Sequence, residues 1–233
     1  MGLKTSNSNK PFKCEYCGAG FAREKTLNVH LCEKKRRHLQ RNERRVYYGF
    51  YAFNRFYRLS VGTKQDKTYE EFCNSTSYNA FVKFGSYISN VKPLYPEKYI
   101  DYVVTSGIKI DKWCDDSLYE KYALELIKKE SVDTAIERTL KTMMDWAETN
   151  DSVWTHYFKY VSENRATWDI RDGKISPWVL LNSVTGKEML GKLNDEQLKI
   201  LYQVLDPAFW KYKFQKHKDD VEVVKELTRE YNF

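Results

Sequence analysis

Two cysteines and a histidine near the start of the chain constrain its fold more than any other feature. Two residues separate Cys14 from Cys17, and twelve residues separate Cys17 from His30. A Cys-x-x-Cys turn holds two thiolates at the separation that tetrahedral zinc requires, and the longer interval lets a hairpin lead into a helix bearing the third ligand. A segment this short buries too little apolar surface to fold alone, so the metal must supply its stability. We therefore predict one Zn²⁺ site that uses Cys14, Cys17 and His30.

The fourth ligand of this site has two candidates. Cys32 lies two residues after His30, and in an unbroken helix its side chain would point almost directly away from the histidine. His38 lies eight residues after His30 and near the right face, but about 12 Å further along the helix axis. Ending a helix is easier than folding back the chain before His38. We therefore expect Cys32 as the fourth ligand, with His38 as the alternative.

The segment resembles the C2H2 family of zinc fingers, in a C2HC variant with a cysteine in place of the last histidine. Phe21 follows Cys17 at the family's first core position, and Leu27 stands at its second, with two residues between it and His30. The KPF tripeptide before the first cysteine resembles the linker that leads into such fingers. The resemblance implies a small ββα finger over residues 11–38.

The same resemblance places the base-contacting positions of the finger at Arg23, Thr26 and Val29. Positions −1, 3 and 6 of a finger helix face successive bases in the major groove of DNA. Arg23 can pair with the O6 and N7 atoms of a guanine, whereas Thr26 and Val29 offer little beyond contact with a methyl group. One finger covers about three base pairs. We therefore predict low sequence specificity.

Positive charge is concentrated at the start of the chain. Residues 1–45 carry twelve Lys and Arg against four Glu, although the net charge of the whole chain is only +7. A basic arm on a neutral body is typical of a protein that docks on a polyanion, although a merely solvated helix face has the same composition. We expect nucleic acid, in the first place DNA, as the partner. The predicted contact residues are Arg23, Lys25, Thr26, Lys34, Lys35, Arg36, Arg37, Arg41, Arg44 and Arg45.

The segment behind the finger has the pattern of one amphipathic helix that runs into the body. Its apolar side chains recur at helical spacing on one face: Val46, Phe50, Phe53 and Tyr57. Its arginines lie roughly opposite: Arg37, Arg41, Arg44, Arg55 and Arg58. We expect the first face to be buried and the second to stay exposed and cationic.

The rest of the chain predicts helices with short breaks and scarcely any strand. Thr68 and Glu71 form a capping box before an aromatic-rich segment that reaches Ile88, and another helix is expected from about Asp151 to Asp169. Further helix starts are marked by Pro96, Ser131, Pro177, Asn194 and Pro207. The predicted fold class is mainly α: a disordered tail over residues 1–10, the finger, and an all-α domain over residues 39–233.

Composition limits the setting and the chemistry. No window is long and apolar enough to span a membrane. The cysteines are odd in number, with three crowded at one end, so a secreted disulfide framework is not expected. We predict an intracellular, reducing compartment. The chain has no Gly-rich phosphate loop and no Walker-type lysine. No enzyme, no small-molecule substrate and no membrane partner are expected.

The whole chain also has a looser resemblance to uncharacterised proteins of T4-like tailed phages. In those proteins one N-terminal finger that ends in a CEKKRR-like run precedes a helical body. The resemblance implies a host-cell cytoplasmic setting and a role in phage DNA metabolism. The predicted function is a zinc-dependent, nucleic-acid-binding accessory protein whose helical body contacts another protein or a second copy. A zinc-finger adaptor without nucleic-acid binding is the alternative, and a DNA-processing nuclease is a weaker one.

Overall fold

The computed structural model describes residues 10–233, so nearly all of the predicted tail at residues 1–10 lies outside the described residues. The described chain is mainly helical, with a two-stranded antiparallel sheet at its start, which confirms the predicted fold class. No helix in this part of the chain combines the length and the apolarity needed to cross a membrane.

The chain divides into two compact units, a division of the helical body that the sequence does not indicate. Unit 1 runs to Lys92 and includes Pro96–Cys114. Unit 2 consists of Pro93–Tyr95 and Asp115–Phe233.

Unit 1 contains the sheet and six α-helices among its described residues. Its strands and helices are β1 (Phe12–Lys13), β2 (Gly20–Phe21), α1 (Glu24–Asn28), α2 (Glu33–Leu39), α3 (Arg44–Phe56), α4 (Tyr69–Asn74), α5 (Tyr78–Val91) and α6 (Pro96–Thr105). Shorter turns of 3-10 or π helix lie at Gln40–Asn42, Tyr57–Val61 and Ile110–Lys112.

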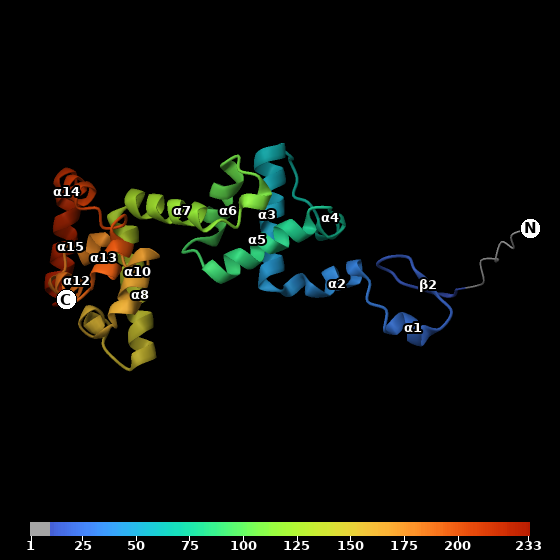
Figure 1. Cartoon of the computed structure of the whole chain (residues 1–233), viewed down its shortest axis with the longest axis horizontal. Helices are drawn as coiled ribbons and strands as arrows, with labels where there is room; N and C mark the ends of the chain where they lie inside the picture. The colour runs from blue at the N-terminus through green and yellow to red at the C-terminus, as the bar shows by residue number, and fades with distance from the viewer. Residues whose placement is uncertain (1–9) are drawn as a thin grey trace, which may run out of the picture. The chain divides into compact units, whose positions relative to one another are not determined.

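The core of unit 1 forms where α3 packs against α5 (Figure 1). A Cβ atom on Gly85 would lie 1.9 Å from the carbonyl oxygen of Arg45, and one on Gly49 would lie 2.9 Å from the carbonyl oxygen of Phe81. The two helices can therefore approach this closely only because each has a glycine at the crossing. Aromatic side chains fill the surrounding space: Phe53, Phe72, Phe81, Phe84 and Trp113.

The prediction of a single helix behind the finger is wrong, because the helical structure is interrupted between α2 and α3. A 3-10 turn follows α2, and Glu43 has an extended backbone with φ −68° and ψ 136°. The apolar face of α3 is buried at Val46 and Phe53, as expected. The predicted arginine face is not uniformly exposed, because Arg37 of α2 and Arg55 of α3 point to partners within unit 1.

The aromatic-rich segment that reaches Ile88 forms two helices. The capping box at Thr68 and Glu71 is present and starts α4, but Ser75 is extended at φ −67° and ψ 139°, and α5 begins at Tyr78. The break lets α4 and α5 contact α3 separately.

Unit 2 is built from helices throughout. They are α7 (Asp116–Lys129), α8 (Val132–Asn150), α9 (Tyr157–Tyr160), α10 (Glu163–Arg171), α11 (Pro177–Leu180), α12 (Val184–Leu190), α13 (Asp195–Leu201), α14 (Pro207–Lys216) and α15 (Lys218–Glu230). A 3-10 turn lies at Trp154–His156.

Most helix starts in unit 2 follow the predicted local signals. The Ser131 hydroxyl caps α8, and Asn194 forms a capping box at the start of α13. Pro177 and Pro207 occupy the first turns of their helices. The expected helix from about Asp151 to Asp169 is wrong, because Val161 is extended and the chain forms a 3-10 turn, α9 and α10 instead.

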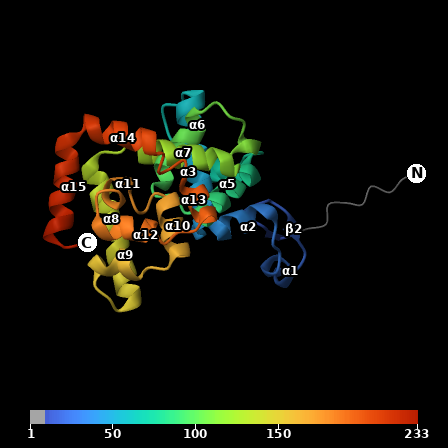
Figure 2. The same ribbon diagram turned by 60° about the vertical axis from the view of Figure 1, so that its left-hand side comes forward.

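The core of unit 2 lies among α8, α11 and α15, which Figure 2 shows together with α14. Trp178 and Trp210 are each 1% exposed and contact each other edge to face. Beside them the Arg138 guanidinium pairs with the carboxylate of Glu130, and its Nε donates to the carbonyl oxygen of Gly173. This ion pair is buried, so its hydrogen bonds are needed to offset the loss of hydration.

Candidate metal centre

The first two candidate ligands lie on a tight hairpin. Phe12 pairs with Phe21 in the antiparallel sheet, and the Cys14 backbone N–H donates to the carbonyl oxygen of Ala19 at 2.9 Å. Gly18 has φ +73°, a left-handed conformation that glycine adopts without steric cost. This turn brings the side chain of Cys17 round towards that of Cys14.

The other two candidate ligands lie beyond the finger helix. α1 ends at Asn28, so His30 follows the helix and is not part of it. Cys32 is the N-cap residue of α2, and its Sγ accepts a hydrogen bond from the Lys35 backbone N–H at 3.4 Å. The chain thus ends one helix and begins another around the two ligands, which removes the obstacle to Cys32 that an unbroken helix would present.

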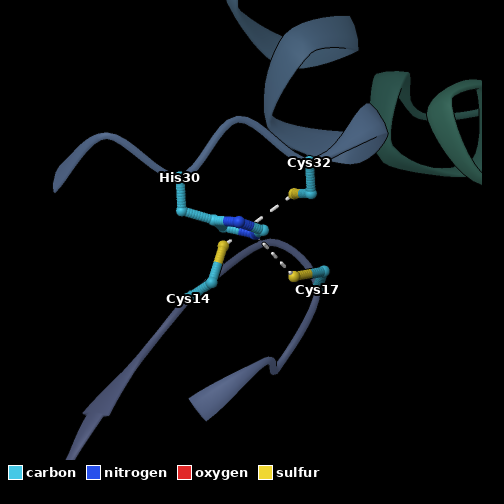
Figure 3. A group of neighbouring side chains, drawn as sticks. All are labelled: Cys14, Cys17, His30 and Cys32. Atoms are coloured by element: carbon cyan, nitrogen blue, oxygen red, sulfur yellow. Dashed lines mark hydrogen bonds between the residues drawn. The ribbon is translucent and has the colours of Figure 1, made fainter. Parts of the chain in front are cut away.

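Side chains from these segments converge on one point (Figure 3). The ligand atoms of Cys14, Cys17, His30 and Cys32 all lie within 4.8 Å of one another. The Sγ atoms of Cys14 and Cys32 are 3.9 Å apart. The Cys17 Sγ lies 3.3 Å from the Nε2 of His30.

Two of these separations, Cys14 to Cys32 and Cys17 to His30, suit a tetrahedral metal ion. Zn–S and Zn–N bonds of usual length give about 3.8 Å between two sulfurs and about 3.6 Å between sulfur and nitrogen across a tetrahedral angle. Both measured separations differ from these values by about 0.3 Å or less. Three thiolates and one imidazole are a donor set of structural zinc sites. The group can therefore hold one metal ion.

The surroundings of Cys14 favour its ionised form. Burial opposes ionisation of the Cys14 thiol, but the backbone N–H groups of Cys17 and Tyr16 and the neighbouring thiols outweigh it and lower the pKa of Cys14. A thiolate is the form that binds metal. The ring of Phe21 lies 4.7 Å from that of His30 and covers one side of the histidine.

The alternative fourth ligand, His38, lies elsewhere in unit 1. Its ring is 5.2 Å from that of Tyr16 and 6.3 Å from that of Tyr69, measured between centroids. His38 therefore contacts Tyr16 on the hairpin turn but does not join the group formed by the other four side chains.

The predicted contact residues of the finger are at its surface. Arg23, Lys25 and Thr26 are exposed on or just before α1, and Val29 is 81% exposed beyond its end. Each side chain that the resemblance assigns to base contact is therefore accessible.

Most of the basic residues behind the finger are exposed as well. On α2, Lys34 and Arg36 are exposed and Lys35 is half-buried. After it, Arg41, Arg44 and Arg45 are exposed. Of these last three, Arg45 pairs with Glu43 at 2.6 Å, and the Arg44 Nη2 contacts the Tyr48 hydroxyl at 3.4 Å.

Arg37 is not exposed as predicted. Its side chain is only 13% exposed, and its Nη1 donates to the carbonyl oxygen of Cys73 at 2.6 Å. Its guanidinium lies 4.2 Å from the ring centroid of Tyr78 and also pairs with Glu33. Arg37 therefore joins α2 to the helices of unit 1 and is not available to neutralise a phosphate.

Sequence reasoning missed a groove beside the metal site. Its volume is about 530 Å³, and the aromatic rings of Tyr16, His38 and Tyr69 line it. No local pattern marks it, because its walls come from three segments that are distant in sequence.

Comparisons with protein-family models, with curated proteins and with solved structures gave no match. The resemblance of the whole chain to phage proteins therefore receives no support from them and stays a prediction.

Proposed function

We propose that unit 1 is a zinc-dependent module that binds nucleic acid, in the first place DNA, with low sequence specificity. The observation that carries the proposal is that Cys32 has two roles: it belongs to the metal-binding group and it caps α2. Loading the metal thereby fixes the start of the helix that presents the basic residues. Zinc acts here as a structural ion.

The charge on this helix supports binding to a polyanion. Within residues 10–233, no ion pair involves Lys34, Lys35 or Arg36. Cations without a carboxylate partner can release counterions from phosphates at little cost, and such contacts make binding fall steeply as salt rises.

The finger itself supports low specificity. Arg23 is the only one of its three base-contacting positions with a bidentate hydrogen-bond donor. α1 is five residues long, and Val29 lies beyond its end. Affinity in this proposal comes mostly from the phosphate backbone.

The proposed role is that of an accessory protein in a reducing compartment. Three of the four candidate ligands are thiols, which must stay reduced to bind zinc. Unit 2 would contact another protein, and exposed apolar side chains on and near α10 and α13 support this: Trp168, Leu198, Ile200 and Tyr202. Binding, without a catalytic step, is the activity that we propose.

The test is fluorescence anisotropy with random duplex and single-stranded DNA over a range of salt concentrations. Replacing Lys34, Lys35 and Arg36 together by Gln should weaken binding by about tenfold or more and reduce the salt slope. The matched control replaces three exposed lysines of unit 2, Lys121, Lys187 and Lys192, by Gln and changes net charge equally. A chelator should weaken DNA binding by the wild-type protein as well.

Absence of binding at low salt would overturn the proposal and leave the adaptor function, which the exposed apolar side chains of unit 2 also fit. An equal loss of DNA affinity in the two triple variants would show that binding depends on net charge and not on a site on α2. Metal-dependent cleavage of the probes would point to the nuclease.

A further inference from the structure

The groove beside the metal site combines flat rings with charge of both signs. It lies between the hairpin of the finger, α2 and α4. Its lining residues are Glu15, Tyr16, Lys34, His38, Arg41, Tyr69, Glu70, Cys73 and Asn74. A volume of about 530 Å³ leaves room for one nucleotide but not for a duplex.

The aromatic walls are held in place from behind. The Tyr69 hydroxyl donates to the carbonyl oxygen of Arg37 at 2.6 Å, and its ring meets the ring of Phe50 edge to face at 5.5 Å. Tyr16 lies between two candidate metal ligands, so the metal fixes its backbone. His38 is placed between these two walls by α2. Nucleobases stack on rings that are pre-organised in this way.

The charged groups divide between two kinds of contact. Lys34 and Arg41 supply cations, and the Arg41 guanidinium lies 5.3 Å from the ring centroid of Tyr69. Glu15 and Glu70 oppose a second phosphate in the groove, but their carboxylates can accept hydrogen bonds from the amino group of a base.

We infer that this groove takes one unstacked nucleotide of a single-stranded nucleic acid, with its base against Tyr16 and His38 and its phosphate near Lys34 and Arg41. Cytosine, adenine and guanine carry an amino group from which the carboxylates would accept a hydrogen bond. The inference rests on the proposed function and makes it more specific, because it assigns single strands, and not duplex, as the preferred partner.

The experiment distinguishes binding of the base from binding of the phosphates. Anisotropy compares an eight-residue cytosine oligonucleotide with an abasic chain of equal length and charge, and with a duplex. The wild-type protein should bind the cytosine oligonucleotide about tenfold more tightly than the abasic chain. An oligonucleotide with a single 2-aminopurine should lose fluorescence on binding, because stacking quenches this base.

The variants remove one ring at a time. Tyr16→Ala and His38→Ala should each lose most of the preference over the abasic chain and most of the quenching, whereas Tyr16→Phe keeps the ring and should retain both. Zinc content of each variant shows whether the finger is still loaded. If Tyr16→Ala loses zinc, His38→Ala carries the test, because His38 lies outside the metal-binding group.

The outcomes distinguish the two proposals. Equal binding of cytosine and abasic chains by the wild-type protein, with loss of both in the triple Gln variant of α2, would overturn the groove as a base site and leave the proposed function intact. No binding to any probe at low salt would overturn the proposed function itself. Wild-type quenching that persists in both Ala variants would place the base elsewhere.

Discussion

The finger and unit 2 are stabilised in different ways. Among residues 10–32 only Cys14 is buried, and the core side chains Phe21 and Leu27 are half-buried. Unit 2 buries a continuous apolar cluster around Trp178 and Trp210. We therefore expect the finger to depend on a bound metal for its order, and unit 2 to depend on removing apolar surface from water. The two parts should respond to different perturbations.

Removing the metal should have the largest effect and should be confined to the finger. Structural zinc contributes roughly 10–16 kcal/mol of apparent binding free energy in finger peptides. We expect amide hydrogen exchange over residues 10–32 to lose its protection in a chelator, while residues 177–210 keep theirs. Unchanged protection of the finger without metal would show that our comparison is wrong.

The next largest effect separates the two candidates for the fourth ligand. Cys32→Ser should weaken zinc binding by roughly a hundredfold or more, because it removes a thiolate from the group. His38→Ala should leave zinc affinity close to that of the wild type. Competition with a chromophoric chelator measures both, and the reverse order of effects would assign the site to His38.

A cavity in unit 2 should leave zinc binding untouched. Trp178→Ala removes a side chain that is 1% exposed and should lower the free energy of unfolding of unit 2 by about 3–5 kcal/mol. Trp168→Ala is the matched control, since that ring is 47% exposed, and should cost less than about 1 kcal/mol. Urea denaturation monitored by circular dichroism measures the change in the free energy of unfolding. A parallel fall in zinc content would contradict the independence of the two parts.

The smallest effect concerns the crossing of α3 and α5 in unit 1. Gly85→Ala would place a Cβ 1.9 Å from a backbone oxygen of α3 and should destabilise unit 1 by about 1–3 kcal/mol. Gly191→Ala is the control, because its nearest neighbour would lie 3.4 Å away. We expect the control to shift stability by less than about 0.5 kcal/mol. Equal shifts in thermal unfolding would show that the crossing of α3 and α5 can relax.

Features set by neighbouring residues were predictable from the sequence. The spacing of Cys14, Cys17 and His30 indicates a metal site because ligand geometry is local. Capping signals such as those at Thr68 and Asn194 start helices where they were expected, because each cap satisfies backbone groups within three residues.

Features set by distant residues were not predictable. The periodicity behind the finger gives no sign of the break at Glu43, and nothing near Arg37 shows that it will contact the carbonyl oxygen of Cys73. The groove is a similar case, because Tyr69 reaches it only through the folding of α4. Tertiary contacts override local patterns in each of these places.

The short helix α2 is held at both ends, which restricts how the length of this segment can change. Cys32 fixes its first turn at the metal-binding group, and Arg37 fixes its later part against Tyr78. An inserted residue between them would turn Arg37 by about 100° around the helix axis and shift it by about 1.5 Å. Substitutions at the exposed positions of α2 should therefore be tolerated far better than insertions or deletions. We expect the number of residues in this segment to change little among homologous proteins.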